Sequence, residues 1–174
     1  MVEQKYKSAS TSINKNKPAK LGRILCEHFA TAGDTVLDYG GGKYDTTEAY
    51  LAANGIICNV YDPFNRDEEV NSMTLGEFDY DWAMLSNVLN VVAEKPVRLM
   101  ILEDVKKHLK DEGILLVKVY EGDGTGTLKV NEKKNSCQMN QKIKFYYWEV
   151  AAVFGEQNTQ YATCDGTRII MATK

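Results

Sequence analysis

Short apolar segments alternate with helical segments along most of this sequence, and this alternation limits the folds open to the chain. A strand followed by a helix and another strand usually builds a parallel sheet with helices on both faces. The predicted strands cover residues 35–39, 56–61, 70–74, 82–86, 114–120, 160–164 and 168–172, and the predicted helices cover residues 18–29, 45–53, 95–110 and 145–154. Asp165-Gly166, between the last two strands, is typical of a tight hairpin turn. We therefore predict a mostly parallel α/β sheet that ends in an antiparallel hairpin.

The composition is that of one globular domain over residues 1–174, because 44% of the residues are apolar and 26% are charged. No apolar run approaches the roughly 20 residues of a membrane helix, and the N-terminus lacks the apolar core of a signal peptide. The four cysteines and two histidines are widely spaced, so we expect reduced thiols, a cytoplasmic location and no metal site. Residues 1–16 are polar and irregular, and we expect a flexible or substrate-facing arm there.

A glycine triplet, residues 40–42, follows the first predicted strand and precedes a helix. Glycines there let the backbone approach a ligand, and the start of the next helix offers free N–H groups. Asp62 lies at the end of the second strand, where a carboxylate can accept hydrogen bonds from both hydroxyls of a ribose. An NAD-type GxGxxG pattern needs glycine at position 45, where Asp45 would face a pyrophosphate with negative charge. An NAD(P) enzyme is therefore the less favoured alternative. If the loop binds no ligand, the glycines form only a tight turn.

The order of Asp38, Gly40, Gly42 and Asp62 resembles the pattern of class I S-adenosylmethionine-dependent methyltransferases. Residues 81–92 and 110–117 resemble the strand-four and strand-five motifs of that family, and the Ser-Asn-Val-Leu-Asn-Val segment is similar to small methyltransferase-like proteins of bacteria and phages. The resemblance covers most of the chain. It implies a Rossmann-like three-layer sandwich with a seven-stranded, mostly parallel sheet and a C-terminal hairpin, and S-adenosyl-L-methionine as cofactor.

The resemblance also implies which residues contact the cofactor. Asp38 would bind its ammonium group, which NAD lacks, and Asp62 would hold the ribose. The full predicted set is Asp38, Tyr39, Gly40, Gly42, Asp62, Pro63, Met73, Ser86 and Asn87. Lys43 and Tyr44 are larger than the residues that many relatives carry at this loop, which would narrow the pocket for the methionine part.

Methyl transfer from a sulfonium needs mainly an aligned acceptor, and a base only where that acceptor is protonated. Asn87 and Glu121 are the predicted catalytic residues, since they follow strands four and five. The predicted substrate-binding residues are Asn90, Asp123, Gln138 and Asn140. Turn formation is the alternative role for the Asn and Asp residues. Residues 86–89 contain no proline and no Pro-Cys, so the motifs of base-amino and cytosine-5 methylation are absent.

Two basic segments stand out in a chain whose net charge is −3. Residues 1–23 hold six basic residues against one acidic residue, and residues 129–144 hold five against one. If the two segments meet beside the methyl group, they favour a phosphorylated acceptor, either nucleic acid or a nucleotide. Exposed lysines without a ligand are the alternative.

The sequence therefore predicts an S-adenosylmethionine-dependent methyltransferase whose acceptor is unidentified. A non-catalytic regulator or complex subunit that keeps the fold and binds the cofactor is the second hypothesis, because 174 residues leave no room for an inserted substrate domain. Cofactor turnover separates the two.

Overall fold

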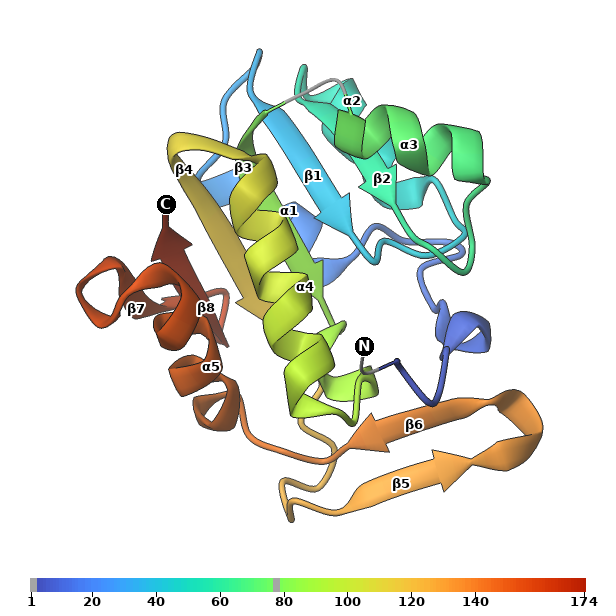
Figure 1. The fold of residues 1–174 in the computed structure, drawn as a ribbon. Coiled ribbons are helices and arrows are strands. Elements are labelled where there is room, and N and C mark those ends of the chain that lie inside the picture. The colour runs from blue at the N-terminus through green and yellow to red at the C-terminus, as the bar shows by residue number, and fades with distance from the viewer. Residues whose placement is uncertain (1–2, 77–78) are drawn as a thin grey trace.

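A mixed six-stranded sheet with the strand order β2-β1-β3-β4-β8-β7 forms the centre of the structure (Figure 1). The computed structural model describes residues 3–76 and 79–174. The strands of the sheet are β1 (Thr35–Tyr39), β2 (Ile57–Tyr61), β3 (Tyr80–Ser86), β4 (Leu109–Lys118), β7 (Thr159–Cys164) and β8 (Thr167–Thr173). The first four run parallel to one another, and β8 pairs antiparallel with both β4 and β7. The predicted C-terminal antiparallel hairpin is confirmed.

Helices cover both faces of this sheet. They are α1 (Lys20–His28), α2 (Thr46–Ala53), α3 (Glu68–Gly76), α4 (Lys95–His108) and α5 (Lys144–Phe154), with short 3-10 helices η1 (Ala9–Thr11), η2 (Leu89–Val91), η3 (Glu132–Lys134) and η4 (Glu156–Asn158). On one face α1 and α2 bury Leu25 and Leu51 against the strands. On the other face α4 and α5 bury Leu102 and Tyr146. The result is the three-layer Rossmann-like sandwich that the sequence predicts.

The predicted strand at residues 70–74 is wrong, and the sheet has six strands rather than seven within the described residues. This segment lies within α3 instead. A strand there would need an alternating buried face, but Val70 and Met73 are 44% and 52% exposed. Glu68 and Glu69 occupy the first turn of the helix, where negative charge is favourable. β2 is consequently an edge strand of the described sheet.

The polar connection predicted at residues 121–142 contains a second, two-stranded antiparallel sheet. Its strands are β5 (Leu128–Asn131) and β6 (Ser136–Met139), joined through η3. Figure 1 shows this hairpin at the bottom of the molecule, below α4 and beside the N-terminal segment. We call it the β5–β6 hairpin. It projects beyond the carboxyl ends of the parallel strands.

The N-terminal arm (residues 3–16) lies against this hairpin. Tyr6 and Ser8 are buried. The backbone N–H of Ser8 donates to the carbonyl of Asn135 at 2.9 Å, and Tyr6 Oη donates to Glu132 at 2.9 Å. No helix within residues 3–76 and 79–174 is long and apolar enough to cross a membrane.

Candidate functional site

A cavity of about 610 Å³ opens at the carboxyl ends of β1, β2 and β3. Open α/β sheets bind ligands at this edge, and the volume lies in the range of small-molecule sites. The cavity is walled by the glycine loop (residues 40–42), by the segments after β2 and β3, and by the arm and the β5–β6 hairpin. Ten predicted site residues line it: Asp38, Tyr39, Gly40, Gly42, Asp62, Pro63, Ser86, Asn87, Asn90 and Gln138.

The glycine loop is held in a backbone conformation that only glycine adopts readily. Gly40 and Gly42 have φ values of +79° and +80°. A Cβ atom at Gly40 would lie 2.7 Å from Val88 Cγ2, and one at Gly42 would lie 2.6 Å from Ser12 Oγ. The loop is therefore closely packed between the segment after β3 and the N-terminal arm, and a side chain at either glycine would collide with Val88 or Ser12.

Asp38 places a buried carboxyl group on the cavity wall. Its side chain is 2% exposed, and its Oδ1 has no hydrogen-bond partner among the described residues. Burial raises the pKa of Asp38 to about 7; the positive charge of Arg66 opposes that rise, and the negative charges of Asp62 and Glu48 add to it. An unpaired buried carboxyl is costly. A cationic ligand group would relieve that cost and return the carboxyl to its charged form.

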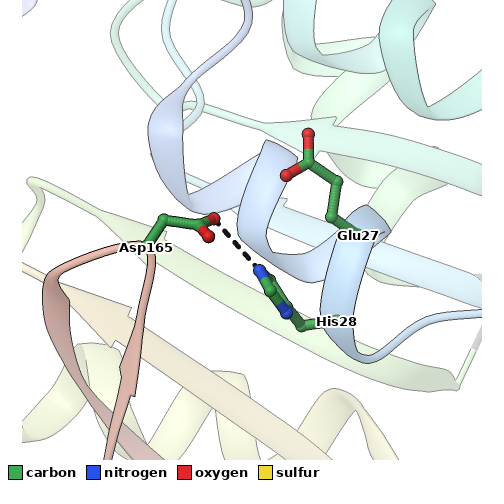
Figure 2. A group of neighbouring side chains, drawn as sticks. All are labelled: Glu27, His28 and Asp165. Atoms are coloured by element: carbon green, nitrogen blue, oxygen red, sulfur yellow. Dashed lines mark hydrogen bonds and ion pairs between the residues drawn. The ribbon is translucent and has the colours of Figure 1, made fainter.

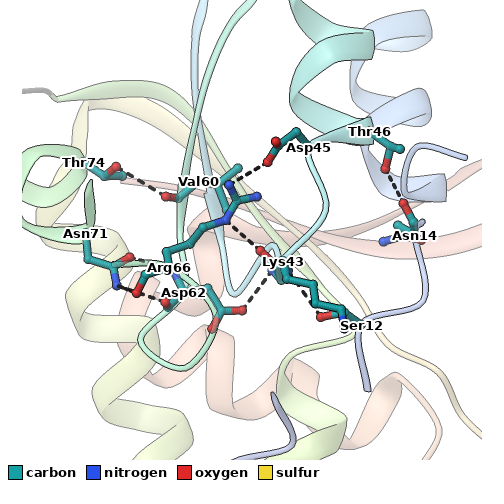
Figure 3. A network of polar contacts seen from close by, with 11 residues as sticks. Ser12, Asn14, Lys43, Asp45, Thr46, Val60, Asp62, Arg66, Asn71 and Thr74 are labelled. Carbon is teal, nitrogen blue, oxygen red and sulfur yellow. Dashed lines mark hydrogen bonds and ion pairs between the residues drawn. The ribbon is translucent and has the colours of Figure 1, made fainter. Parts of the chain in front are cut away.

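Asp62 ties the end of β2 to the glycine loop. Its Oδ2 accepts a hydrogen bond from the backbone N–H of Gly42 at 2.9 Å (Figure 3). Its Oδ1 accepts from the N–H groups of Phe64 and Asn65 at 2.9 and 3.0 Å, and from Asn65 Nδ2 at 3.2 Å. Each carboxylate oxygen has two lone pairs. Oδ1 already accepts three hydrogen bonds, whereas Oδ2 accepts only one and can accept another from a ligand in the cavity.

Arg66 fastens the same loop from outside the cavity. Its Nε donates to the carbonyl of Gly42 at 2.9 Å, and its Nη1 donates to Asp45 at 2.6 Å (Figure 3). Asp45, which argues against a pyrophosphate ligand, is thus paired with a cation. Tyr44 lines the cavity, whereas Lys43 does not.

The arm closes the cavity through contacts at two places. At the glycine loop, Ser12 Oγ accepts from the N–H of Lys43 at 3.4 Å, and the hydroxyl of Thr46 donates to the carbonyl of Asn14 (Figure 3). At the other end the arm joins the β5–β6 hairpin through Ser8. The arm and the β5–β6 hairpin, which belong to the two basic segments, therefore lie together beside the cavity, and Lys7 and Lys129 line it.

The segment after β3 supplies two asparagines to the cavity wall. Asn87 has φ +60° and its Oδ1 accepts a hydrogen bond from Lys118 Nζ at 3.1 Å. Burial lowers the pKa of Lys118, and the charge of Lys20 lowers it further. Asn90 is 2% exposed, and its Nδ2 donates to Gln138 Oε1 of the hairpin at 2.8 Å.

Four predicted site residues do not line the cavity: Met73, Glu121, Asp123 and Asn140. Met73 is exposed on α3. Glu121 accepts from the N–H of Ile143 at 2.7 Å at the start of α5. Asp123 accepts from Thr125 and from Asn140 Nδ2 within the same connection, and the hydroxyl of Thr125 lowers its pKa most. These contacts shape the turns around the β5–β6 hairpin.

Sequence reasoning did not single out several residues of the cavity wall. Ser8, Ser12, Val91 and Cys137 line it, and the thiol of Cys137 donates to the carbonyl of Val91 at 3.2 Å. The only signals for them were the polarity of the arm and the length of the connection after β4.

A separate cluster of Glu27, His28 and Asp165 lies between the end of α1 and the β7–β8 turn (Figure 2). Its possible ligand atoms lie within 4.8 Å of one another. His28 Nε2 pairs with Asp165 at 3.0 Å, and Glu27 accepts from Tyr50 Oη at 3.3 Å. These contacts account for the cluster without an ion, and none of its residues lines the cavity.

Solved structures that are similar to this chain include S-adenosylmethionine-dependent methyltransferases. The chain is similar to the 1,6-didemethyltoxoflavin-N1-methyltransferase of Burkholderia thailandensis, crystallised with 1,6-didemethyltoxoflavin and S-adenosylhomocysteine, with a TM-score of 0.65 and 18% identity over 88% of this chain and 76% of that one. An amino pentose methyltransferase from Micromonospora echinaspora with bound S-adenosylmethionine gives a TM-score of 0.53 and 13% identity, over 98% and 92% of the two chains.

Some of these neighbours are much longer. An O-methyltransferase family 2 protein from Planctomyces limnophilus, solved with apigenin, gives a TM-score of 0.56 and 14% identity over 88% of this chain, which spans 56% of its length. No protein-family model matches the chain, and neither does any curated protein sequence. The structural likeness establishes the class I methyltransferase fold that the sequence resemblance predicts.

Proposed function

We propose that this chain, which has the class I methyltransferase fold, binds S-adenosylmethionine and transfers its methyl group to an acceptor. The observation that carries this proposal is the buried Asp38 Oδ1, unpartnered among the described residues, on the wall of a cavity beside the glycine loop. A cationic amino group is the natural partner for such a carboxyl. The cofactor supplies that group and an activated methyl group.

The remaining cavity residues suit the other parts of the cofactor. Gly40 and Gly42 let the loop backbone itself form part of the cavity wall. Asp62 Oδ2, which accepts one hydrogen bond within the protein, can accept another from a ribose hydroxyl. Asn87, which Lys118 orients, lies after β3, where it can contact the acceptor. Since the methyl group arrives activated, alignment of the acceptor supplies most of the rate acceleration, and the enclosing arm helps to exclude water.

The acceptor is proposed to be small enough to enter the cavity. Two of the neighbours are named for small acceptors, namely 1,6-didemethyltoxoflavin and an amino pentose. The basic arm and hairpin over the cavity add attraction for a phosphate, which supports a nucleotide or the end of a nucleic acid among these acceptors. This phosphorylated acceptor stays a prediction.

Calorimetric titration of the purified chain with S-adenosylmethionine, S-adenosylhomocysteine and NAD tests the cofactor. We expect binding of the first two and none of NAD. Absence of binding by both S-adenosyl compounds would contradict the proposed function.

Turnover is a second measurement. Incubation of the cofactor with a metabolite extract should release S-adenosylhomocysteine faster than in the Asn87→Ala variant. Binding without any turnover over a broad set of acceptors would favour the non-catalytic alternative.

A further inference from the structure

We infer that Asn90 forms a hydrogen-bond-accepting subsite for the methyl acceptor, and that this acceptor is a small aromatic or heteroaromatic molecule carrying an N–H or O–H donor. The inference rests on the proposed function, because it assigns the part of the cavity that the cofactor does not need. Asn90 lies on η2, is 2% exposed and lines the cavity. Its Oδ1 is buried and has no partner among the described residues.

The contacts of Gln138 fix which end of the Asn90 amide is left without a partner. Gln138 Nε2 donates to the carbonyls of Tyr120 and Met139 at 3.0 and 2.8 Å. Its Oε1 is therefore turned toward Asn90 and accepts from Asn90 Nδ2 at 2.8 Å. A flipped Asn90 amide would set two carbonyl oxygens against each other. The group that Asn90 offers is thus an acceptor, and it calls for a donor on the ligand.

Apolar side chains line the same cavity as this amide pair. They include Val91 and Val92, which directly follow Asn90 in the sequence, and Val97 and Ile101 of α4. Ligand pockets of this kind combine apolar walls with a few fixed polar groups that orient the ligand. A flat ring satisfies the walls, and one N–H or O–H on that ring satisfies Asn90 Oδ1.

Matched pairs of probes can test this subsite without knowledge of the natural acceptor. Phenol and fluorobenzene have nearly the same shape, as do indole and benzofuran, but only phenol and indole carry a donor. Each probe is titrated into the chain saturated with S-adenosylhomocysteine and followed by protein-detected NMR. We expect phenol and indole to bind about five- to tenfold more tightly than their partners, the effect of one buried hydrogen bond.

Variants connect this preference to Asn90. Asn90→Leu should bring the affinity ratio of each pair to about one. Gln138→Met frees the Asn90 amide to flip, and should reduce the ratio even if Asn90→Leu does not fold. Asn158→Leu is the matched control, since Asn158 donates to the carbonyl of Phe154 at 3.0 Å and does not line the cavity. It should leave the ratio unchanged.

Three results would overturn the inference: no binding of phenol or indole, equal binding within each pair, or a preference that survives in both Asn90→Leu and Gln138→Met. Equal binding is also the result expected if an ordered water occupies Asn90 Oδ1. The affinity for S-adenosylhomocysteine is measured separately in every variant. If that ligand does not bind the native chain, the proposed function fails, and the probe pairs still test the subsite on the chain without it.

Discussion

Asp38 is the residue whose protonation should control cofactor binding. Its pKa of about 7 lies well above the usual range because the carboxyl is buried. Only the ionised carboxylate can pair with an ammonium group, so affinity for S-adenosylmethionine should rise between about pH 6 and pH 8 as Asp38 loses its proton. Titration calorimetry at several pH values measures this rise.

Two comparisons isolate the role of Asp38. The rise should disappear in Asp38→Asn, and a cofactor analogue without the amino group should show no rise with the native chain. If Asp38→Ala weakens the cofactor and that analogue equally, the carboxyl does not bind the ammonium group.

Asp62 should matter to the cofactor and to the loop together. Asp62→Ala removes the charged acceptor expected for the ribose and also leaves the N–H of Gly42 without its partner. We expect cofactor affinity to fall roughly 30- to 100-fold and stability to fall by about 1–3 kcal/mol. Calorimetry and urea unfolding give the two values. Unchanged affinity in a folded variant would remove Asp62 from the cofactor site.

Two glycines with similar backbone strain offer a matched test of the loop. Gly42 has φ +80° and faces Ser12, whereas Gly33 has φ +97° and a Cβ added there would meet no described atom within 4 Å. Ala at either position is strained by about 1 kcal/mol. We expect only Gly42→Ala, and more strongly Gly42→Val, to block cofactor binding. If Gly42→Val and Gly33→Ala bind the cofactor with equal affinity, the glycine triplet forms only a turn and is not part of the cofactor site.

At the scale of elements, a buried ion pair joins α4 to α5. Arg98 and Glu149 are 2% and 5% exposed, and two hydrogen bonds of 2.7 and 2.6 Å connect them. Arg98 Nη1 also donates to the carbonyls of Val92 and Ala93, beside the cavity. Glu149→Ala leaves a buried guanidinium unpaired and should cost about 3–5 kcal/mol in urea unfolding. A decrease in the free energy of unfolding below about 1 kcal/mol is typical of an exposed ion pair and would contradict this prediction.

The elements also show what a sequence pattern can and cannot predict. The apolar strand before the glycine loop and the Asp165-Gly166 turn are local signals, and both correctly located their elements. The segment at residues 70–74 has no such local signal. Its apolar residues Val70 and Met73 suggest a buried strand, but both are exposed on α3. The pairing of Leu128 with Met139 depends on contacts between distant residues. Ser8 and Asn135 lie together for the same reason.

For the candidate site, the sequence is informative where the backbone geometry requires special residues. Glycines at positive φ and a carboxyl at the end of each of two strands are visible in one chain. Glu121 and Asp123 were placed near the acceptor by their position after a strand, but their carboxylates are engaged with nearby turns. Position along the chain cannot tell which way such a side chain points.

At the scale of the whole molecule, the basic arm and hairpin test the phosphorylated acceptor. Lys133→Ala/Lys134→Ala should weaken binding of short DNA and RNA, and binding should fall severalfold or more between about 50 and 200 mM salt. Lys107→Ala/Lys110→Ala removes the same charge beside the opposite end of β4 and should have no effect. Fluorescence anisotropy measures both. The prediction would be wrong if nothing binds at low salt, or if binding changes neither with salt nor with the loss of Lys133 and Lys134. These lysines would then be exposed residues without a ligand.

The replacement of a seventh strand by α3 leaves a backbone edge that the helix must protect. Asn71 Oδ1 accepts a hydrogen bond from the N–H of Asp62, and Asn71 Nδ2 donates to the carbonyl of Asp62 (Figure 3). The hydroxyl of Thr74 donates to the carbonyl of Val60 at 3.4 Å. These side chains take the place of the ladder that a neighbouring strand would supply. Unprotected edges recruit strands from other molecules. Loss of the contacts of Asn71 and Thr74 would therefore open the edge of β2 to pairing with another molecule.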